Sequence, residues 1–147
     1  MATLDFIHVG ITVKDLDVTR RFYEKLGFTV SKEPFATTWE GYWKAKNFFY
    51  KLPEGTNGKI LFMASPSGAK VEFFWFDQLV DGEYDVWNRP GIHHIALSTD
   101  DIKSVVEALR AEGVEFELGP VKGTTQEFVF LRDPDGNMIE IGQPYDL

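Results

Sequence analysis

The chain has 147 residues, 44% of them hydrophobic and 26% charged, which is the size and composition of one globular domain with a substantial core. Its formal net charge of −8 argues against nucleic acid and anionic membranes as partners, because both require a basic surface. The absence of cysteine excludes disulfides, thiolate metal sites and a cysteine nucleophile.

The N-terminal stretch MATLDFIHVGITVKD differs from a secretory signal, because no basic residues precede its apolar run and Asp5 lies within that run. No apolar run in the sequence approaches the length needed to span a membrane. We therefore expect a cytoplasmic protein.

The first half of the chain is predicted to contain one helix between strands. An apolar run over residues 4–13 predicts the first strand. Asp15 is placed to cap a helix that Gly27 ends, and its apolar residues are Val18, Phe22 and Leu26. Three strands are expected to follow, over residues 28–30, 59–65 and 70–76. Seven of the sixteen residues in the extra segment 35–50 are aromatic.

The second half shows the same order. A strand is expected over residues 92–99, then a helix capped by Asp100 or Asp101 and closed by Gly113. The apolar face of this helix consists of Ile102, Val105, Val106 and Leu109. The remaining strands are predicted over residues 114–118, 127–132 and 138–142, with the turn DPDGN at residues 133–137.

The two halves align as an internal repeat. His8 lies 19 residues before Gly27, and His94 lies 19 residues before Gly113. Histidine, strand, aspartate, amphipathic helix and glycine therefore recur in register. We expect a single domain over residues 1–147, built from a module at 4–76, a polar linker at 77–91 and a second module at 92–143.

Alternation along the strands predicts where the histidines point. His8 shares a face with Gly10 and Thr12, and His94 shares one with Ala96 and Ser98. The bulky aliphatic residues of each strand lie on the other face, where the helix is expected to cover them. Small neighbours leave room beside each histidine for a ligand. By the same alternation, His93 is expected on the helix side or at the edge, with no role.

Two glutamates interrupt otherwise apolar strands, Glu72 in KVEFFWF and Glu140 in MIEIG. An ionised carboxylate in such a strand is costly unless it is paired or bound to a metal. Each residue alone is typical of an ordinary strand histidine or an edge glutamate. The repeat supplies the same pair of residue types twice, which favours one nitrogen and oxygen site for a divalent ion.

These motifs resemble the vicinal oxygen chelate superfamily, and within it the glyoxalase I family. The specific stretches are HVGITVKDLDVTRRFYEKLGF, KVEF, GIHHIALSTDDI and GPVKGTTQEFVFLRDPDGNMIEI. The resemblance implies an α+β fold in which two tandem βαβββ modules form a cup-shaped sheet around one divalent metal. Carried over residue by residue, the metal ligands are His8, Glu72, His94 and Glu140.

The resemblance also implies a reaction. A Lewis-acidic metal on two adjacent substrate oxygens stabilises an enediolate, and a glutamate at the metal moves the proton between carbons. Glu140 is the first candidate for this base and Glu72 the second. Ni²⁺, Co²⁺, Zn²⁺ and Mn²⁺ all suit such ligands. A homodimer is implied too; residues 77–91 leave open whether the site lies within one chain, and we expect it to be shared between subunits.

The substrate is expected to be a small molecule, a carbonyl compound or a hemithioacetal. In glyoxalase I, an arginine four residues after the first ligand and an asparagine four residues after the second help to hold glutathione. Those positions are Thr12 and Phe76 here. Arg20, Arg21 or Lys122 would have to supply the missing positive charge.

Other members of the superfamily provide alternatives. Methylmalonyl-CoA epimerases are similar around PGIHHIAL but typically have glutamine where Glu72 stands. Extradiol dioxygenases and fosfomycin-modifying enzymes use three ligands, so a fourth argues against them. Metal-free antibiotic-binding members use an aromatic groove, for which residues such as Trp39, Tyr42, Trp43, Phe48, Phe49 and Tyr50 would be suited. We expect most of these aromatic residues to pack in the core or a dimer interface.

Overall fold

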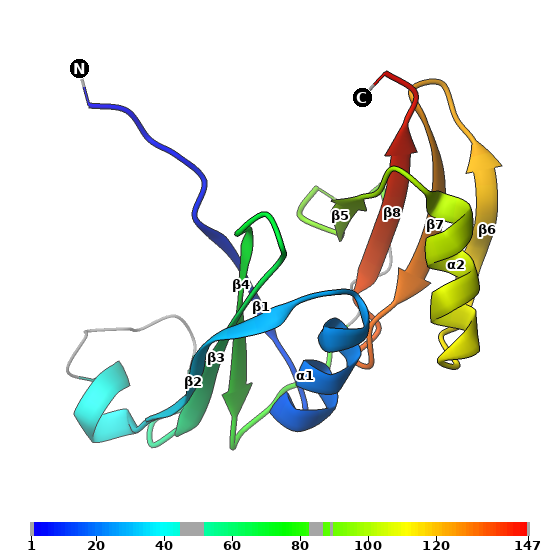
Figure 1. Cartoon of the computed structure of the whole chain (residues 1–147). Helices are drawn as coiled ribbons and strands as arrows, with labels where there is room; N and C mark the ends of the chain where they lie inside the picture. Colours follow the sequence, from blue (N-terminus) through cyan, green and yellow to red (C-terminus); the bar gives the residue numbers. More distant parts are fainter. Residues whose placement is uncertain (1, 45–51, 83–86, 89, 147) are drawn as a thin grey trace. The chain divides into compact units, whose positions relative to one another are not determined.

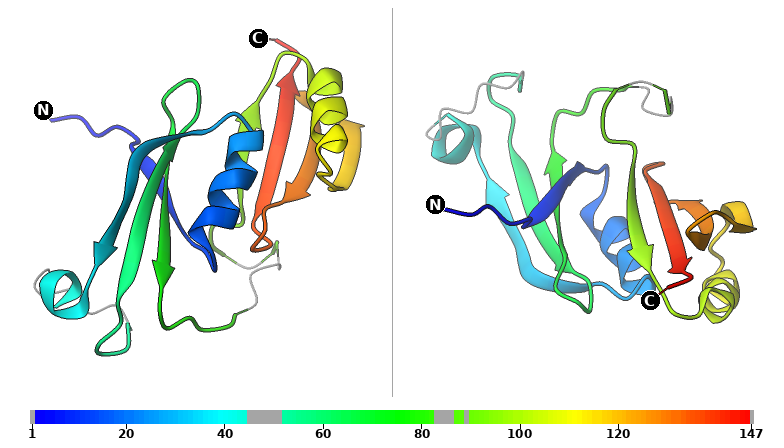
Figure 2. Two further views of the ribbon diagram at one scale, coloured as in Figure 1. Left: turned by 60° about the horizontal axis from the view of Figure 1, so that its bottom comes forward. Right: turned by 90° about the horizontal axis from the view of Figure 1, so that it is seen from above.

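The computed structural model describes residues 2–44, 52–82, 87–88 and 90–146. Its contacts divide the chain into two compact units, Met1–Asp81 and Gly82–Leu147. Each unit contains a four-stranded sheet and one α-helix (Figures 1 and 2). The described residues contain no helix that is long and apolar enough to cross a membrane.

The first unit is a βαβββ module with an added π-helical turn. Its elements are β1 (His8–Thr12), α1 (Leu16–Lys25), β2 (Thr29–Thr37), η1 (Trp39–Trp43), β3 (Gly58–Ala64) and β4 (Lys70–Phe76). The strand order is β1-β4-β3-β2, in which β1 and β4 run parallel and the other pairs antiparallel.

The second unit repeats this module. Its elements are β5 (His94–Ser98), α2 (Ile102–Ala111), β6 (Phe116–Lys122), β7 (Gln126–Arg132) and β8 (Met138–Pro144). The strand order β5-β8-β7-β6 corresponds strand for strand to that of the first unit. The prediction of an α+β fold with two tandem βαβββ modules is therefore confirmed.

The two α-helices begin and end at residues that the sequence predicted. Asp15 caps α1 by accepting hydrogen bonds from two backbone amides, and Asp101, rather than Asp100, caps α2. Gly27 and Gly113 follow the two helices with φ of +90° and +83°, a conformation that favours glycine. The turn at 133–137 is closed by the Asp133 carboxylate.

The buried face of α1 differs from the predicted one. Thr19 and Tyr23 are fully buried, and Tyr23 packs against Phe73 of β4 at 4.7 Å between ring centroids. Val18 is exposed, and Phe22 is half-buried. The core face is thus rotated by one residue, and Tyr23, which contacts both Phe28 and Phe73, takes the core position instead of Phe22.

Several strands differ in length from their predicted ranges. β1 begins only at His8, which pairs with Lys70, the first residue of β4; within the described part of the chain, no strand pairs with the residues before it. In the second unit, β5 likewise begins at His94, which pairs with Met138. The short strand expected at 28–30 instead continues to Thr37 through two irregularities in its pairing with β3.

The core of each unit lies between its helix and one face of its sheet. On β3 and β4 the buried residues on that face are Leu61, Met63, Val71 and Phe73. In the second unit the corresponding residues are Val129, Leu131, Ile139 and Ile141, together with Ile102, Val106 and Leu109 of α2. Glu72 of β4 and Glu140 of β8 lie on the opposite face of their sheets.

Candidate functional site

Each unit places one histidine beside one glutamate on the sheet face away from its helix. In the first unit, β1 and β4 run side by side with Gly10 opposite Glu72, so His8 and Glu72 share a face. His8 Nε2 lies 2.8 Å from Glu72 Oε2. In the second unit, Ala96 pairs with Glu140, and His94 Nε2 lies 3.2 Å from Glu140 Oε2. The predicted faces are confirmed.

Both pairs are partly shielded from solvent. The exposed fractions of the His8 and Glu72 side chains are 36% and 16%, and those of His94 and Glu140 are 27% and 13%. The small residues Gly10 and Ala96 lie opposite the two glutamates. A carboxylate in this setting needs a partner, and an imidazole supplies one.

The donor atoms of each pair fit a divalent cation. Two donors that each lie about 2.1 Å from one ion, on adjacent positions, are roughly 3 Å apart. The two Nε2–Oε2 distances match that spacing. Imidazole nitrogen and carboxylate oxygen are also the ligands that borderline divalent metals prefer. Within each unit, the described histidine and acidic side chains form a pair rather than a group of three.

Gln126, the first residue of β7, is a further residue at the His94–Glu140 pair that the sequence pattern does not indicate. Its Nε2 donates a hydrogen bond to Glu140 Oε1, so both carboxylate oxygens of Glu140 have partners. The path between them runs over Gly142, where a Cβ would collide with the Gln126 amide. Alternation and the pairing of β7 with β8 could have placed Gln126 on this face. Neither indicates that the missing side chain of Gly142 lets Gln126 reach Glu140.

The structure corrects the expectation for His93. This residue precedes β5, so strand alternation does not govern its direction. Its ring stacks on that of His94 at 4.7 Å, and the two Nδ1 atoms are 2.7 Å apart. Trp87 packs against both rings, with centroid distances of 4.3 Å to His93 and 5.5 Å to His94.

An aromatic cluster extends over the same face of the first sheet. Its members are Phe35, Trp43, Phe62, Phe74 and Phe76. Phe62 pairs with Glu72 and contacts His8 edge-on at 5.8 Å. Phe76 stacks on Phe74 and is packed against Trp43, which is 2% exposed. Phe76, which stands where the resemblance implies an asparagine, thus belongs to an aromatic surface.

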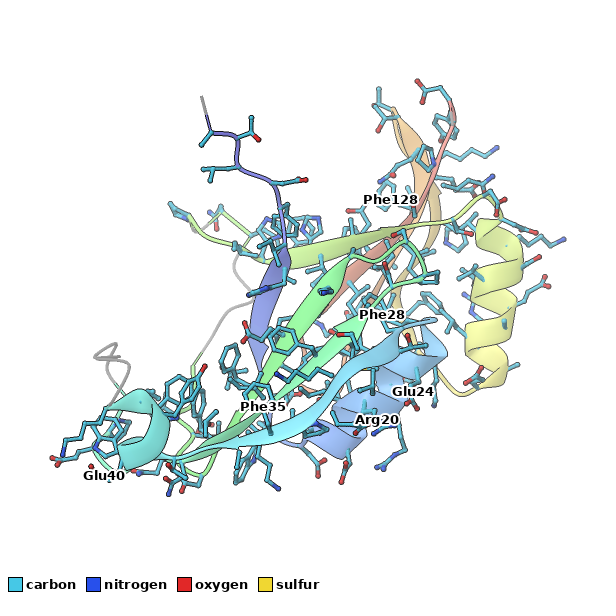
Figure 3. All side chains as sticks on the ribbon, turned by 60° about the vertical axis from the view of Figure 1, so that its left-hand side comes forward. Arg20, Glu24, Phe28, Phe35, Glu40 and Phe128 are labelled. Atoms are coloured by element: carbon cyan, nitrogen blue, oxygen red, sulfur yellow. The ribbon has the colours of Figure 1, made fainter. Side chains whose placement is uncertain are left out.

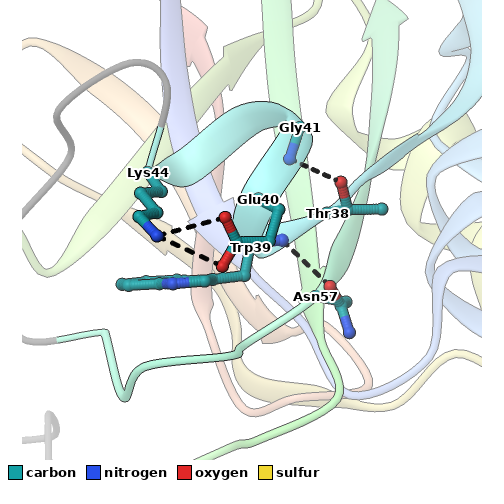
Figure 4. Close-up of polar contacts among 6 residues, drawn as sticks. All are labelled: Thr38, Trp39, Glu40, Gly41, Lys44 and Asn57. Atoms are coloured by element: carbon teal, nitrogen blue, oxygen red, sulfur yellow. Dashed lines mark hydrogen bonds and ion pairs between the residues drawn. The ribbon is translucent and has the colours of Figure 1, made fainter.

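The turn η1, which carries Trp43, is hydrogen-bonded to Asn57, the residue before β3. Trp39 donates its backbone N–H to Asn57 Oδ1 at 2.9 Å, and Thr38 Oγ1 accepts from the N–H of Gly41 at 3.0 Å (Figure 4). Lys44 pairs with Glu40 across the turn. The expected packing role is therefore found for Trp43, while Phe48, Phe49 and Tyr50 lie outside the described residues.

Arg20 is engaged elsewhere. It extends from α1, which covers the opposite face of the sheet, and its Nε lies 3.0 Å from Glu24 (Figure 3). Its Nη1 lies 3.5 Å from Glu33. The hydrogen bond to Glu24 raises the pKa of Arg20. Within the first unit, Arg20 therefore serves the helix surface rather than the His8–Glu72 pair.

Comparison with known proteins agrees with this architecture. The model of the Glyoxalase/Bleomycin resistance protein/Dioxygenase superfamily matches residues 5–141. The chain belongs to this superfamily. A lactoylglutathione lyase of Haemophilus influenzae is 51% identical over 93% of the chain and 90% of its own length. A probable lactoylglutathione lyase of Vibrio parahaemolyticus is 48% identical over 93% of the chain and 88% of its own length.

Solved structures share the fold. A glyoxalase family protein from Bacillus cereus superposes with a TM-score of 0.78 at 21% identity, covering 98% of this chain and 96% of its own. A glyoxalase family protein from Enterococcus faecalis has a TM-score of 0.69 at 26% identity, covering 94% of this chain and 96% of its own. These likenesses extend over both modules.

Proposed function

We propose that this protein is a glyoxalase I-like, divalent-metal-dependent lyase or isomerase that acts by enediolate chemistry on a small carbonyl compound or hemithioacetal. The observation that carries the proposal is the repeated pair, an imidazole 2.8 or 3.2 Å from a carboxylate on the free face of each sheet. The relatives named lactoylglutathione lyase support the reaction class.

In this proposal His8, Glu72, His94 and Glu140 hold one ion. The repeat supports a shared ion, because each module contributes the same two ligand types from corresponding strands. The bound cation supplies Lewis acidity toward two adjacent oxygens of the substrate. We further propose Ni²⁺, Co²⁺, Zn²⁺ or Mn²⁺ as the cation, and a homodimer with the site shared between its subunits.

The two glutamates of this proposal move the proton. A carboxylate beside the substrate removes the proton from the carbon next to the carbonyl and returns it to the neighbouring carbon. Glu140 is proposed as this base, with Glu72 as the second candidate. Gln126 holds Oε1 of Glu140, so Oε2, the oxygen beside His94, would serve in turn as a ligand of the cation and as the atom that exchanges the proton.

The experiment that tests this reaction follows solvent deuterium into substrates. The metal-loaded protein is incubated in D₂O with 2-hydroxycarbonyl compounds, thiohemiacetals and acyl-CoA esters, and exchange is measured by NMR. We expect exchange with at least one class, and a loss of about 10²–10⁴-fold in the Glu140→Gln variant. Full exchange in that variant would remove Glu140 from the role of base, and Glu72→Gln would then identify the alternative.

The aromatic cluster favours a second candidate, a metal-free protein that binds a planar ligand. Phe62, Phe74 and Phe76 present their rings on the face that carries Glu72. A protein of this kind would take up no metal and would catalyse no exchange. Elemental analysis after dialysis against divalent metals separates the two candidates before any substrate is known.

A further inference from the structure

We propose that His93 is a positioning residue that fixes the ring orientation and the tautomer of His94. The inference rests on the proposed function in one respect, namely that His94 offers Nε2 to a cation. Its structural basis is separate, because it concerns the nitrogen on the other side of the His94 ring. It also gives the second of the two adjacent histidines a role that strand alternation does not predict.

The Nδ1–Nδ1 contact constrains the protons of both rings. At 2.7 Å the two atoms are within hydrogen-bond distance, so one nitrogen carries the proton and the other accepts it. A neutral imidazole carries one N–H, and the donor at Nδ1 therefore has its lone pair at Nε2. The tautomer of His93 and the tautomer of His94 are coupled through this single proton.

The environment of His94 Nε2 sets the tautomers when no cation is present. Nε2 lies 3.2 Å from a carboxylate oxygen of Glu140, which accepts but does not donate. The Nε2 of His94 then carries the proton, and its Nδ1 accepts from His93. A cation on Nε2 requires the opposite arrangement, in which Nδ1 of His94 donates to His93.

The change of tautomer leaves the number of protons on the two histidines, and so their total charge, unchanged. Nε2 of His94 loses a proton to solvent, the shared proton passes from Nδ1 of His93 to Nδ1 of His94, and Nε2 of His93 gains a proton from solvent. Histidines that bind metals characteristically donate their second N–H to a nearby acceptor, which raises their basicity. His93 supplies that acceptor here.

Packing holds the two rings in this relation. The His93 and His94 planes are inclined by 26°, and the Trp87 plane lies at 18° to His94. Phe130 of β7 packs edge-on against His94 and Trp87, at 5.8 and 5.4 Å. The His94 ring is therefore enclosed by aromatic surfaces on several sides, and rotation out of the pair would lose these contacts.

The first unit provides an internal comparison. His8 corresponds to His94 in the repeat, but the residue before it is Ile7, whose exposed fraction is 69%. An aliphatic side chain has no atom that could accept from His8 Nδ1. The proposed positioning therefore applies to one histidine of the repeat only, and Ile7→Ala is the matched control.

The test uses variants of the full chain and a diamagnetic cation. His93→Phe keeps a stacking ring but removes the nitrogen, and His93→Asn restores a polar atom near the position of Nδ1. Imidazole ¹⁵N shifts are recorded with and without Zn²⁺, and Zn²⁺ affinity is measured by competition with a chromophoric chelator. We expect His93→Phe to bind Zn²⁺ about 10–100-fold more weakly, His93→Asn to recover most of the affinity, and Ile7→Ala to match the parent protein.

The spectra separate this inference from the proposed function. In the parent protein, the proton of His94 is expected on Nε2 without Zn²⁺ and on Nδ1 with it. Failure of the parent protein to bind Zn²⁺, Ni²⁺, Co²⁺ and Mn²⁺ alike would contradict the proposed function, while a changed His94 ¹⁵N pattern in metal-free His93→Phe would still support the positioning. Unchanged His94 shifts in His93→Phe, with or without Zn²⁺, would overturn the inference.

Discussion

The two His–Glu pairs differ in what lies beside the carboxylate. Glu72 has Phe62 across the ladder and Phe74 two residues further along β4. Glu140 has Phe130 across the ladder, but Gly142 two residues further along β8. The missing side chain lets Gln126 reach Glu140. Because of Gly142, the Glu140 carboxylate contacts both Gln126 and His94. The Glu72 carboxylate contacts His8 and has Phe62 and Phe74 as its neighbours.

Removal of the Gln126 amide tests this difference. We expect Gln126→Ala to lower proton exchange by about 10–100-fold, because Glu140 loses the donor that orients it. The exchange assay described above measures the loss. Exchange at the parental rate would show that Gln126 does not position Glu140.

Gly142→Ala provides a second test at the same place. The new methyl group would displace the end of the flexible Gln126 side chain, so the expected cost is the hydrogen bond to Glu140, about 0.5–1.5 kcal/mol. Chemical denaturation measures the change in the free energy of unfolding. Because the collision is with Gln126, the double variant Gly142→Ala/Gln126→Ala should be more stable than the sum of the single changes predicts. Strict additivity would contradict this explanation.

Asp101 shows how one residue fixes the start of an element. Hydrogen bonds from Ser104, chiefly from its hydroxyl and then from its backbone N–H, lower the pKa of Asp101. A lowered pKa in the folded state means that the ionised cap stabilises the helix above the pKa of the unfolded chain. That stabilisation is lost as the pH falls through the folded pKa.

The resulting prediction concerns stability in acid. Below about pH 4, the melting temperature of the parent protein should fall further than that of Asp101→Asn, because the variant has no carboxylate at position 101 to protonate. Asp100→Asn is the control, since Asp100 does not cap α2. Thermal unfolding from pH 6 to pH 3 measures the difference. Parallel curves for the parent protein and Asp101→Asn would contradict the assignment.

The start of β3 depends on a close approach of two strands. A Cβ at Gly58 would collide with the backbone oxygen of Trp75 on β4, and backbone cannot move aside cheaply. We expect Gly58→Ala to lower the free energy of unfolding by about 1–3 kcal/mol, as measured by denaturant unfolding. Gly119→Ala on β6 is the control, because the nearest atom to its Cβ is 4.0 Å away. Equal effects of the two changes would contradict the steric argument.

The elements were predictable where local chemistry decides them. Aspartate caps and closing glycines marked both helices, and alternation assigned the correct sheet face to His8 and Glu72. Strand ends were less predictable because they depend on a partner. Leu4, Phe6 and Ile7 are apolar, yet no strand among the described residues pairs with them, whereas β2 continues because β3 does. Tertiary pairing outweighs local pattern in both cases.

At the scale of the whole molecule, the repeat is the dominant feature. Each unit has its own core, its own helix and the same strand order. Under the proposed function, one cation takes two ligands from each kind of module. Binding of that cation would then stabilise both modules together, because a ligand that binds only the folded state adds to its stability.

Metal removal tests this coupling. At a free metal concentration 100-fold above the Kd, binding adds about 2.7 kcal/mol to the free energy of unfolding. We expect a chelator to lower the melting temperature of the metal-loaded parent protein and to leave His8→Ala and His94→Ala unchanged. A chelator effect that persists in either variant would contradict a site that needs both histidines.

The two His–Glu pairs were predictable from the sequence, but their supporting contacts were not. Histidine and glutamate recur at corresponding positions of the repeat, as His8 with Glu72 and His94 with Glu140, and alternation put each pair on one face. The contacts of Gln126 and His93 could not be predicted from the sequence, for physical reasons. Gln126 reaches Glu140 over a glycine, and His93 lies just outside the strand whose alternation was used to place it. Both contacts depend on three-dimensional packing.

The number of metal ions bound per chain decides whether the two His–Glu pairs share one cation. Native mass spectrometry of the metal-loaded protein, with elemental analysis, counts the ions in the parent protein, His8→Ala and His94→Ala. We expect one ion per chain in the parent protein and almost none in either variant. Two ions per chain, with one lost in each variant, would show two separate sites and rule out a shared cation.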